Sequence, residues 1–175
     1  MNMKLQDFMS FLHENKMIDL NHLLSEDEIG CINRLKLQKY VYLAQTCLKY
    51  DFGYEYNIYN NGPYSPDLAN YYYEKLNLEK ISFHKADDVQ NHEKRFFDMF
   101  LELFEGKEPE WLEVAATLID VTNYSENEQE CLNRVYTMKS KYIARFIDNA
   151  WNELKDKNLV NYKHGPKLNN FLSVF

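Results

Sequence analysis

Few residues of this chain combine the types and the spacing that chemistry requires. His84 and His92, together with Glu93, could converge on a metal ion, although solvated surface histidines are the simpler interpretation. Cys47 lies beside the apolar positions of a predicted helix, so we interpret it as a small buried side chain rather than a nucleophile. The five glycines are scattered, and they form neither a phosphate-binding nor a dinucleotide-binding loop. We therefore expect no enzymatic activity, no metal site and no cofactor.

Tyrosine is the residue type that stands out. The chain holds 14 tyrosines, and eight of them lie between positions 50 and 73. Tyrosine buries a large area at low entropic cost, keeps a polar hydroxyl and is enriched at protein interfaces. Alternatively, several of these rings line the core; Tyr71, Tyr72 and Tyr73 cannot all face inward, because consecutive helical residues point about 100° apart. We expect a partner-binding surface formed by Tyr54, Tyr56, Tyr59, Asn61, Gly62, Pro63, Tyr64, Ser65, Asp67 and Tyr71.

Charged residues are distributed unevenly along the chain. Residues 87–130 hold 13 acidic and 3 basic side chains, whereas residues 131–175 hold 8 basic and 3 acidic ones. The acidic segment either forms solvated helix faces or imitates the phosphates of a nucleic acid. The acidic residues concerned are Asp98, Glu102, Glu105, Glu113 and Asp120. The basic segment carries Lys139, Lys141 and Arg145 without the pattern of a nucleic-acid-binding motif, and the net charge of −7 does not favour a nucleic-acid partner.

The overall composition is that of an ordinary globular protein. A length of 175 residues with 45% hydrophobic side chains suits one domain covering residues 1–175. Three cysteines without paired spacing argue against a disulfide framework. No apolar run approaches the roughly 18–20 residues of a membrane span, and no signal-like segment opens the chain. We expect a cytoplasmic protein that does not enter a membrane; the oligomeric state stays open, a dimer included.

Apolar periodicity predicts a mainly α-helical fold of about seven helices. Ser65 followed by Pro66 marks one helix start, and Ser125 with Glu128 forms a capping box for another. In the last helix Ile143 opens the buried stripe, and Asn158 closes the helix in a left-handed conformation. The predicted helices cover about 5–12, 33–50, 66–76, 89–104, 109–122, 127–138 and 141–157.

A small β element is predicted near residues 54–60. Tyr54, Tyr56 and Ile58 alternate with polar neighbours, and the turn residues Asn60-Asn61-Gly62-Pro63 follow. We expect this strand to pair with the C-terminal part of the chain, around 161–162 or 171–175.

An ordered combination of motifs in the first half resembles the YwgA-like proteins and, more loosely, the SocA-like or Panacea domain of antitoxins. It consists of a helical segment from Lys36 to Gln45 that contains Leu37-Gln38-Lys39, then Asp51-Phe52-Gly53-Tyr54, Tyr59, and the turn Gly62-Pro63-Tyr64-Ser65-Pro66-Asp67-Leu68-Ala69 that opens the next helix. The resemblance covers about 35 residues. It implies an intracellular helical module without catalysis; SocA-like modules act by binding a protein, which they neutralise or deliver to a protease.

The leading hypothesis is therefore an antitoxin-like or adaptor-like module that neutralises a protein partner, either a toxin or an enzyme of the host or a phage. Two alternatives stay open. The first is a phage-encoded or mobile-element-encoded inhibitor of a nucleic-acid enzyme, acting through the acidic segment. The second is a winged-helix-like transcriptional regulator, in which the last two helices precede a C-terminal hairpin and the basic segment contacts nucleic acid.

Overall fold

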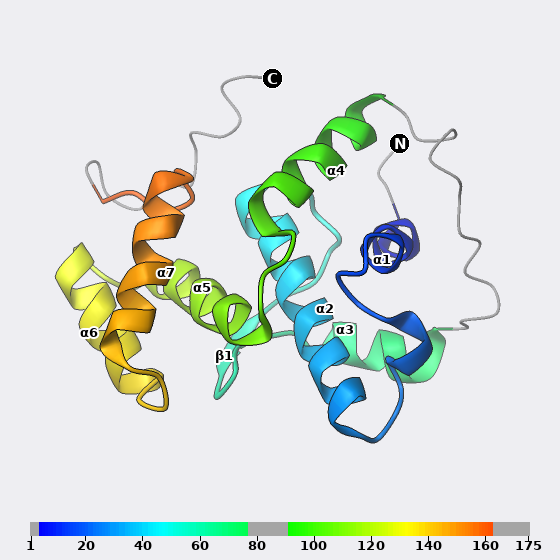
Figure 1. Cartoon of the computed structure of the whole chain (residues 1–175), viewed down its shortest axis with the longest axis horizontal. Helices are drawn as coiled ribbons and strands as arrows, with labels where there is room; N and C mark the ends of the chain where they lie inside the picture. The colour runs from blue at the N-terminus through cyan, green and yellow to red at the C-terminus, as the bar shows by residue number, and fades with distance from the viewer. Residues whose placement is uncertain (1–3, 77–90, 163–175) are drawn as a thin grey trace.

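The structure is a computed structural model that describes residues 4–76 and 91–162. These residues form a mainly α-helical fold with seven α-helices and a two-stranded antiparallel sheet, which confirms the predicted fold class (Figure 1). The α-helices are α1 (Leu5–Glu14), α2 (Glu28–Cys47), α3 (Pro66–Asn70), α4 (Asn91–Phe104), α5 (Pro109–Thr122), α6 (Glu128–Met138) and α7 (Ala144–Asp156). The strands are β1 (Asn57–Tyr59) and β2 (Gly62–Tyr64), and two short helical turns are η1 (Leu20–His22) and η2 (Tyr71–Lys75).

Helix α5 forms the centre of the molecule. Every residue from Trp111 to Thr122 is buried, because this helix is surrounded by α2, α6, α7 and β2. Figure 1 shows α6 and α7 on one side of α5, with α1 to α4 on the other. A helix that is apolar over most of its circumference is stable only in such a central position.

Aromatic side chains join α1 to α4. Phe8 and Phe11 of α1 contact Phe96, Phe97 and Phe100 of α4, and the ring centroids of Phe11 and Phe97 are 4.1 Å apart. These positions recur at helical spacing in both segments, so the contact follows from the amphipathic pattern.

The start of α2 and the cap of α6 differ from the sequence prediction. Helix α2 begins at Glu28 rather than near residue 33, because the Asp27 carboxylate accepts a hydrogen bond from the Gly30 N–H at 2.9 Å and caps the helix there. The capping box on Ser125 is wrong: Asn127 caps α6, while the Ser125 hydroxyl donates to the Val121 carbonyl at the end of α5. Both corrections concern which of several polar residues reaches a free backbone group.

The last helix confirms one terminal prediction and contradicts the other. Asn158 adopts a left-handed conformation with φ of 55° after the end of α7, as predicted. Ile143 does not belong to the buried stripe, because it precedes α7 in an extended conformation and is 73% exposed. Further on, Ile147, Ala150, Trp151 and Leu154 are buried.

The β element lies where the sequence places it, but it does not pair with residues 161–162 as one of the two predictions had it. Strand β1 pairs with β2 across the turn Asn60–Asn61, with Tyr59 opposite Gly62. Residues 161–162 form no strand, and residues 171–175 lie outside the described residues. A hairpin closed by two residues orders far less chain than a pairing with a distant segment.

Among residues 4–76 and 91–162, no helix has the length and apolar character to span a membrane.

Candidate functional site

The hairpin β1–β2 is held by side chains of α2 and by Lys139 after α6, and α5 packs against it. Helix α2 supplies the first of these contacts. The Gln38 amide pairs with both backbone groups of Ser65: its Nε2 donates to the Ser65 carbonyl at 3.0 Å, and its Oε1 accepts from the Ser65 N–H at 2.9 Å. The Lys39 ammonium donates to the Pro63 carbonyl at 2.6 Å. Gln38 and Lys39 thus bind the outer edge of β2 as a neighbouring strand would.

The approach to the hairpin is fixed in the same way. The Gln45 side chain donates to the Tyr54 carbonyl at 2.8 Å and accepts from the N–H groups of Phe52 and Tyr54 at 3.1 and 3.2 Å. The Tyr56 hydroxyl donates to the Gln38 carbonyl at 3.3 Å. Gln38, Lys39 and Gln45 of the helical motif therefore hold segment 52–65 against α2.

Helix α5 contacts the hairpin at its glycine. Gly62 has a φ of +84°, a conformation that side chains other than glycine rarely adopt, and it is buried. A Cβ atom at this position would lie 2.6 Å from the Thr117 Oγ1 and 3.3 Å from the Glu113 carbonyl oxygen. Glycine is thus required both by the backbone conformation and by the close approach of α5.

A buried cluster of charges lies under the hairpin. Lys139, which directly follows α6, donates to the Asn60 carbonyl and to Glu113 Oε1, the latter at 2.8 Å. Glu113 Oε2 also accepts from Lys141 at 3.0 Å and from the Tyr142 hydroxyl at 3.2 Å. The carboxylate is 2% exposed and Lys139 is 1% exposed, so this ion pair connects α5, the α6–α7 connection and the hairpin inside the protein.

Burial shifts the proton affinities of these groups. Desolvation, together with the nearby charge of Lys139, lowers the pKa of Lys39 to about 7, and Glu113 offsets this only in part. Desolvation also lowers the pKa of Lys139, which hydrogen bonding to Glu113 opposes. The pKa of Glu113 would rise on burial alone, but the hydrogen bonds from Lys139 and Lys141 bring it below its ordinary value.

On the solvent side, the hairpin borders a groove of about 720 Å³ between the first half of α2, the hairpin and η2. We call it the tyrosine groove. Tyr59 and Tyr73 on its rim are 51% and 57% exposed, and the apolar side chains Ile32 and Ile58 are 38% and 40% exposed. The Arg34 guanidinium lies 5.7 Å from the centre of the Tyr73 ring. The lining residues are Glu28, Cys31, Ile32, Arg34, Leu35, Gln38, Lys39, Ile58, Tyr59, Asn60, Asn61, Gly62, Tyr64, Tyr72 and Tyr73.

The ten residues expected to bind a partner occupy different environments. Tyr59, Asn61, Gly62 and Tyr64 line the tyrosine groove. Pro63 and Ser65 are buried beneath the hairpin, whereas Asp67 is exposed on α3. Tyr54, Tyr56 and Tyr71 are half-buried and pack against the core.

The expectation that Tyr71, Tyr72 and Tyr73 cannot all face inward is confirmed. Tyr72 is 2% exposed, and Tyr73 is the ring that reaches solvent. Sequence reasoning did not select Tyr73, although it did require one exposed ring of the three. It also missed Ile32 and Arg34, which lie on a face of α2 outside its apolar stripe.

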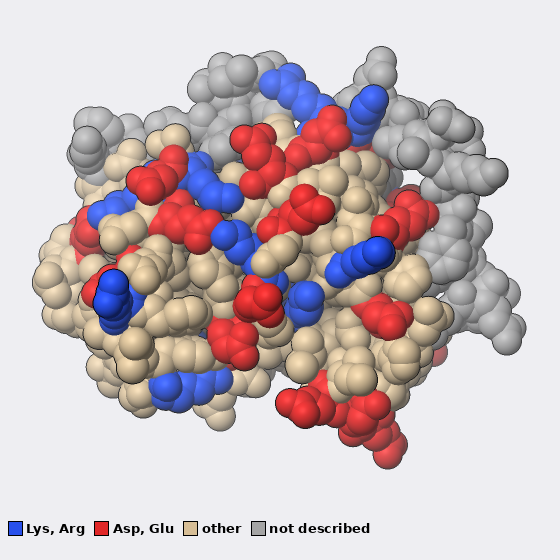
Figure 2. All heavy atoms as spheres, in the orientation of Figure 1, with Lys and Arg blue, Asp and Glu red and all other residues tan. Residues whose placement is uncertain are grey.

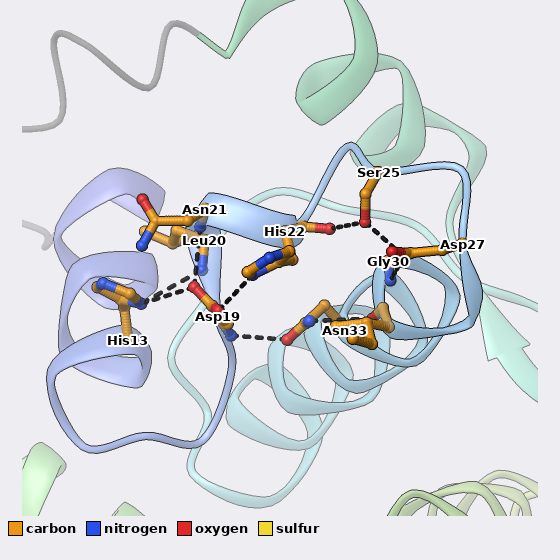
Figure 3. Close-up of polar contacts among 10 residues, drawn as sticks. His13, Asp19, Leu20, Asn21, His22, Ser25, Asp27, Gly30 and Asn33 are labelled. Carbon is orange, nitrogen blue, oxygen red and sulfur yellow. Dashed lines mark hydrogen bonds and ion pairs between the residues drawn. The ribbon is translucent and has the colours of Figure 1, made fainter.

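A second polar cluster lies in the connection between α1 and α2 (Figure 3). The Asp19 carboxylate contacts His22 Nδ1 at 2.6 Å and caps η1 through the Asn21 N–H at 3.0 Å. The Leu20 N–H donates to His13 Nδ1 at 3.2 Å, and Asn33 of α2 accepts from the Asp19 N–H at 2.6 Å. The hydrogen bond from His22 lowers the pKa of Asp19. These contacts hold η1 between α1 and α2, so the cluster has a structural role.

Other candidates from the sequence are placed as follows. The described residues contain no group of three or more His, Cys, Asp and Glu side chains that could hold a metal ion; His84 and the side chain of His92 lie outside them. Cys47 is 3% exposed, and burial raises the pKa of its thiol to about 12. A protonated, buried thiol is a packing residue, as the sequence predicts.

The acidic segment does not form one exposed surface. Asp98 and Glu102 are exposed on α4 and Glu105 is exposed directly after it, but Glu113 and Asp120 of α5 are buried. Figure 2 shows acidic and basic side chains interspersed over the face in view. Two of the five carboxylates that would imitate phosphates are thus inside the protein.

No family model matches this chain, and neither does any curated protein or solved structure.

Proposed function

We propose that this chain is a non-catalytic protein-binding module that neutralises a protein partner by covering part of its surface, in the manner of an antitoxin or an adaptor. The observation that carries the proposal is the tyrosine groove beside a hairpin clamped by Gln38, Lys39 and Lys139. The YwgA-like and SocA-like resemblance supports the same class of function.

The clamp matters because a preorganised surface loses little conformational entropy on binding. The hairpin has buried contacts along β2, so its exposed residues Ile58 and Tyr59 are presented from a fixed backbone. Tyr73 and Ile32 complete the rim of the groove from η2 and α2. Exposed aromatic and aliphatic side chains around a depression are the usual anchors of protein interfaces.

A folded protein partner fits this arrangement better than a nucleic acid. The rim is formed by tyrosine and isoleucine side chains, and the cations at the groove are already engaged: Arg34 donates to the carbonyls of Leu23 and Ser25, both at 2.8 Å, and Lys39 donates to Pro63. Nucleic-acid binding requires cations that are free to contact phosphates.

Affinity capture with matched variants tests the proposal. The wild-type chain, a Tyr59→Ala/Tyr73→Ala double variant and an Ile143→Ala control are each used to capture proteins from native lysate, followed by quantitative mass spectrometry. We expect one protein to be retained by the wild type and the control but reduced at least about tenfold by the double variant, because loss of interface tyrosines weakens binding by roughly 2 kcal/mol or more.

The control is matched, since Ile143 is also exposed and apolar but lies before α7, away from the residues that line the groove. The captured protein is then purified and titrated against the same three chains. Equal retention by all three chains, or loss on Ile143→Ala alone, would exclude the tyrosine groove as the binding surface.

A further inference from the structure

Within residues 4–76 and 91–162, strand β1 pairs with β2 alone, which leaves its other edge without a neighbouring strand. Ile58 lies opposite Pro63 in the hairpin, and proline has no N–H to donate across the ladder. Opposed residues of an antiparallel pair alternate between bonded and non-bonded pairs, so Ile58–Pro63 is a non-bonded pair and the N–H and C=O of Ile58 point away from β2. The outer edge of β2 is occupied by Gln38 and Lys39, so in the described part of the chain a further strand would add to β1.

A second groove, of about 810 Å³, borders this edge. We call it the strand groove. Ile58 forms one wall and α6 the other, and the exposed side chains of Tyr124 and Met138 lie along it. The two edges of a two-stranded sheet face in opposite directions, so the edge of β1 is turned away from α2. The lining residues are Ile58, Asp120, Val121, Tyr124, Asn127, Gln129, Glu130, Asn133, Arg134, Thr137 and Met138.

The strand groove holds a largely buried carboxylate that no cation of the described residues compensates. Asp120 is 9% exposed, and its Oδ1 accepts from the Tyr42 hydroxyl at 3.3 Å. Burial raises the pKa of Asp120, which Tyr42 opposes only in part. The other acid of the groove, Glu130, is paired with Arg134 at 2.7 Å. The unmatched charge in the groove is therefore negative and belongs to Asp120.

We propose that an extended segment of the protein partner adds to β1 as a third strand in the strand groove, with a lysine or arginine side chain that reaches Asp120. This inference rests on the proposed function, because it names the part of the partner that is recognised. Main-chain hydrogen bonds to Ile58 provide affinity, and the charge at Asp120 selects the sequence. A helical segment would leave the edge of β1 unused, and a nucleic acid would bring phosphates against a carboxylate.

Selection from a display library of random peptides of about ten residues, long enough for one strand, tests the inference. We expect the purified chain to enrich peptides with a lysine or arginine flanked by β-branched residues at alternating positions. Fluorescence polarisation then compares an enriched peptide with two derivatives, one with norleucine in place of the cationic residue and one N-methylated at the residue that pairs with Ile58. Each derivative should bind at least about tenfold more weakly.

Variants of the chain provide the complementary measurement. Ile58→Pro removes the outward N–H and should abolish binding, whereas Ile58→Val keeps the N–H and should retain it. Asp120→Asn should weaken the parent peptide without weakening the norleucine derivative further. Because the peptide derivatives are measured on the wild-type chain, the test does not depend on whether Asp120→Asn folds.

The outcomes separate this inference from the proposed function. Enriched peptides that are insensitive to N-methylation, to norleucine and to Ile58→Pro would overturn the inference. If their binding is lost only on Tyr59→Ala/Tyr73→Ala, the tyrosine groove binds peptide and the proposed function is supported while the inference falls. A library that enriches no peptide also overturns the inference, whereas the proposed function is decided by capture of a folded partner.

Discussion

At the scale of single residues, buried polar side chains of this protein act on backbone groups far away in the sequence. Gln38 pairs with Ser65, which lies 27 residues away, and Lys139 donates to Asn60, which lies 79 residues away. The Gln38 contact satisfies two main-chain groups of Ser65 that would otherwise be buried without a partner, a loss of about 1–3 kcal/mol per group. Lys39 is a charged side chain in the same role: the residue is 2% exposed, and its ammonium hydrogen-bonds to the Pro63 carbonyl.

Lys39 predicts a pH dependence of stability. Its pKa falls from 10.5 to about 7 on folding, because the ammonium is desolvated and lies near Lys139. Between these values the unfolded chain binds a proton that the folded chain does not, so the free energy of unfolding contributed by Lys39 rises with pH. Below about pH 7 both states bind the proton and the contribution is flat. Relative to a Lys39→Met variant, the wild type should gain about 2 kcal/mol between about pH 7 and 9.

Urea unfolding of the two chains at a series of pH values measures this difference. A Lys94→Met variant serves as the control, because Lys94 is exposed on α4, and it should follow the wild type at every pH. Parallel curves for the wild type and Lys39→Met would show that Lys39 keeps its proton in the folded state.

At the scale of elements, the hairpin depends on helix α5 as much as on its own turn. Gly62 and Gly53 have nearly the same backbone conformation, with φ of +84° and +81°. They differ in their surroundings, because a Cβ atom at Gly53 meets nothing within 4 Å, whereas one at Gly62 meets Thr117. Substitutions at Gly53 and Gly62 therefore separate the energetic effect of backbone strain from that of packing.

We expect Gly53→Ala to destabilise the protein by about 1 kcal/mol, which is the strain of a left-handed alanine. Gly62→Ala should lower the free energy of unfolding by about 1–3 kcal/mol more than Gly53→Ala does, because the new methyl group collides with Thr117. Thermal and denaturant unfolding measure both values. In a Thr117→Ala background the additional loss at Gly62 should shrink, and a loss that does not change would show that Thr117 is not the obstacle.

At the scale of the whole molecule, Glu113 connects parts that no secondary structure element joins. Its carboxylate binds Lys139, Lys141 and Tyr142, and through Lys139 it is linked to the turn of the hairpin. The same side chain thus couples α5, the α6–α7 connection and the candidate binding surface. Removal of one partner from a buried ion pair leaves the other charge uncompensated.

We expect Glu113→Gln to lower the free energy of unfolding by about 3–5 kcal/mol and to increase hydrogen exchange in the hairpin. Because the pKa of Glu113 is lowered in the folded protein, its contribution is present above the ordinary value of 4.5 and is lost as the pH falls below it. Glu128→Gln is the matched control: near the surface Glu128 accepts from Lys155 at 2.9 Å and from the Trp151 Nε1–H at 2.7 Å. Glutamine keeps an oxygen acceptor for both, so the replacement should change stability by less than about 1 kcal/mol. Similar losses for both variants would contradict a linking role for Glu113.

Local patterns were sufficient to determine much of the architecture from the sequence alone. The apolar spacing of α1, α5 and α7, the start of α3 at Ser65 and Pro66, and the left-handed Asn158 all involve residues within a few positions of each other. Helix periodicity and capping are short-range properties, so they can be derived without knowing the fold.

Only the tertiary structure decided those contacts and exposures that local patterns do not specify. It paired β1 with β2 rather than with residues 161–162, left Ile143 exposed and enclosed Asp120. It also assigned Gln38 and Lys39 to the hairpin and made Tyr73 the exposed ring of three. These outcomes depend on contacts between residues that are distant in the sequence. Until the helices have packed around α5, the contact energies of several alternative arrangements of the chain are comparable.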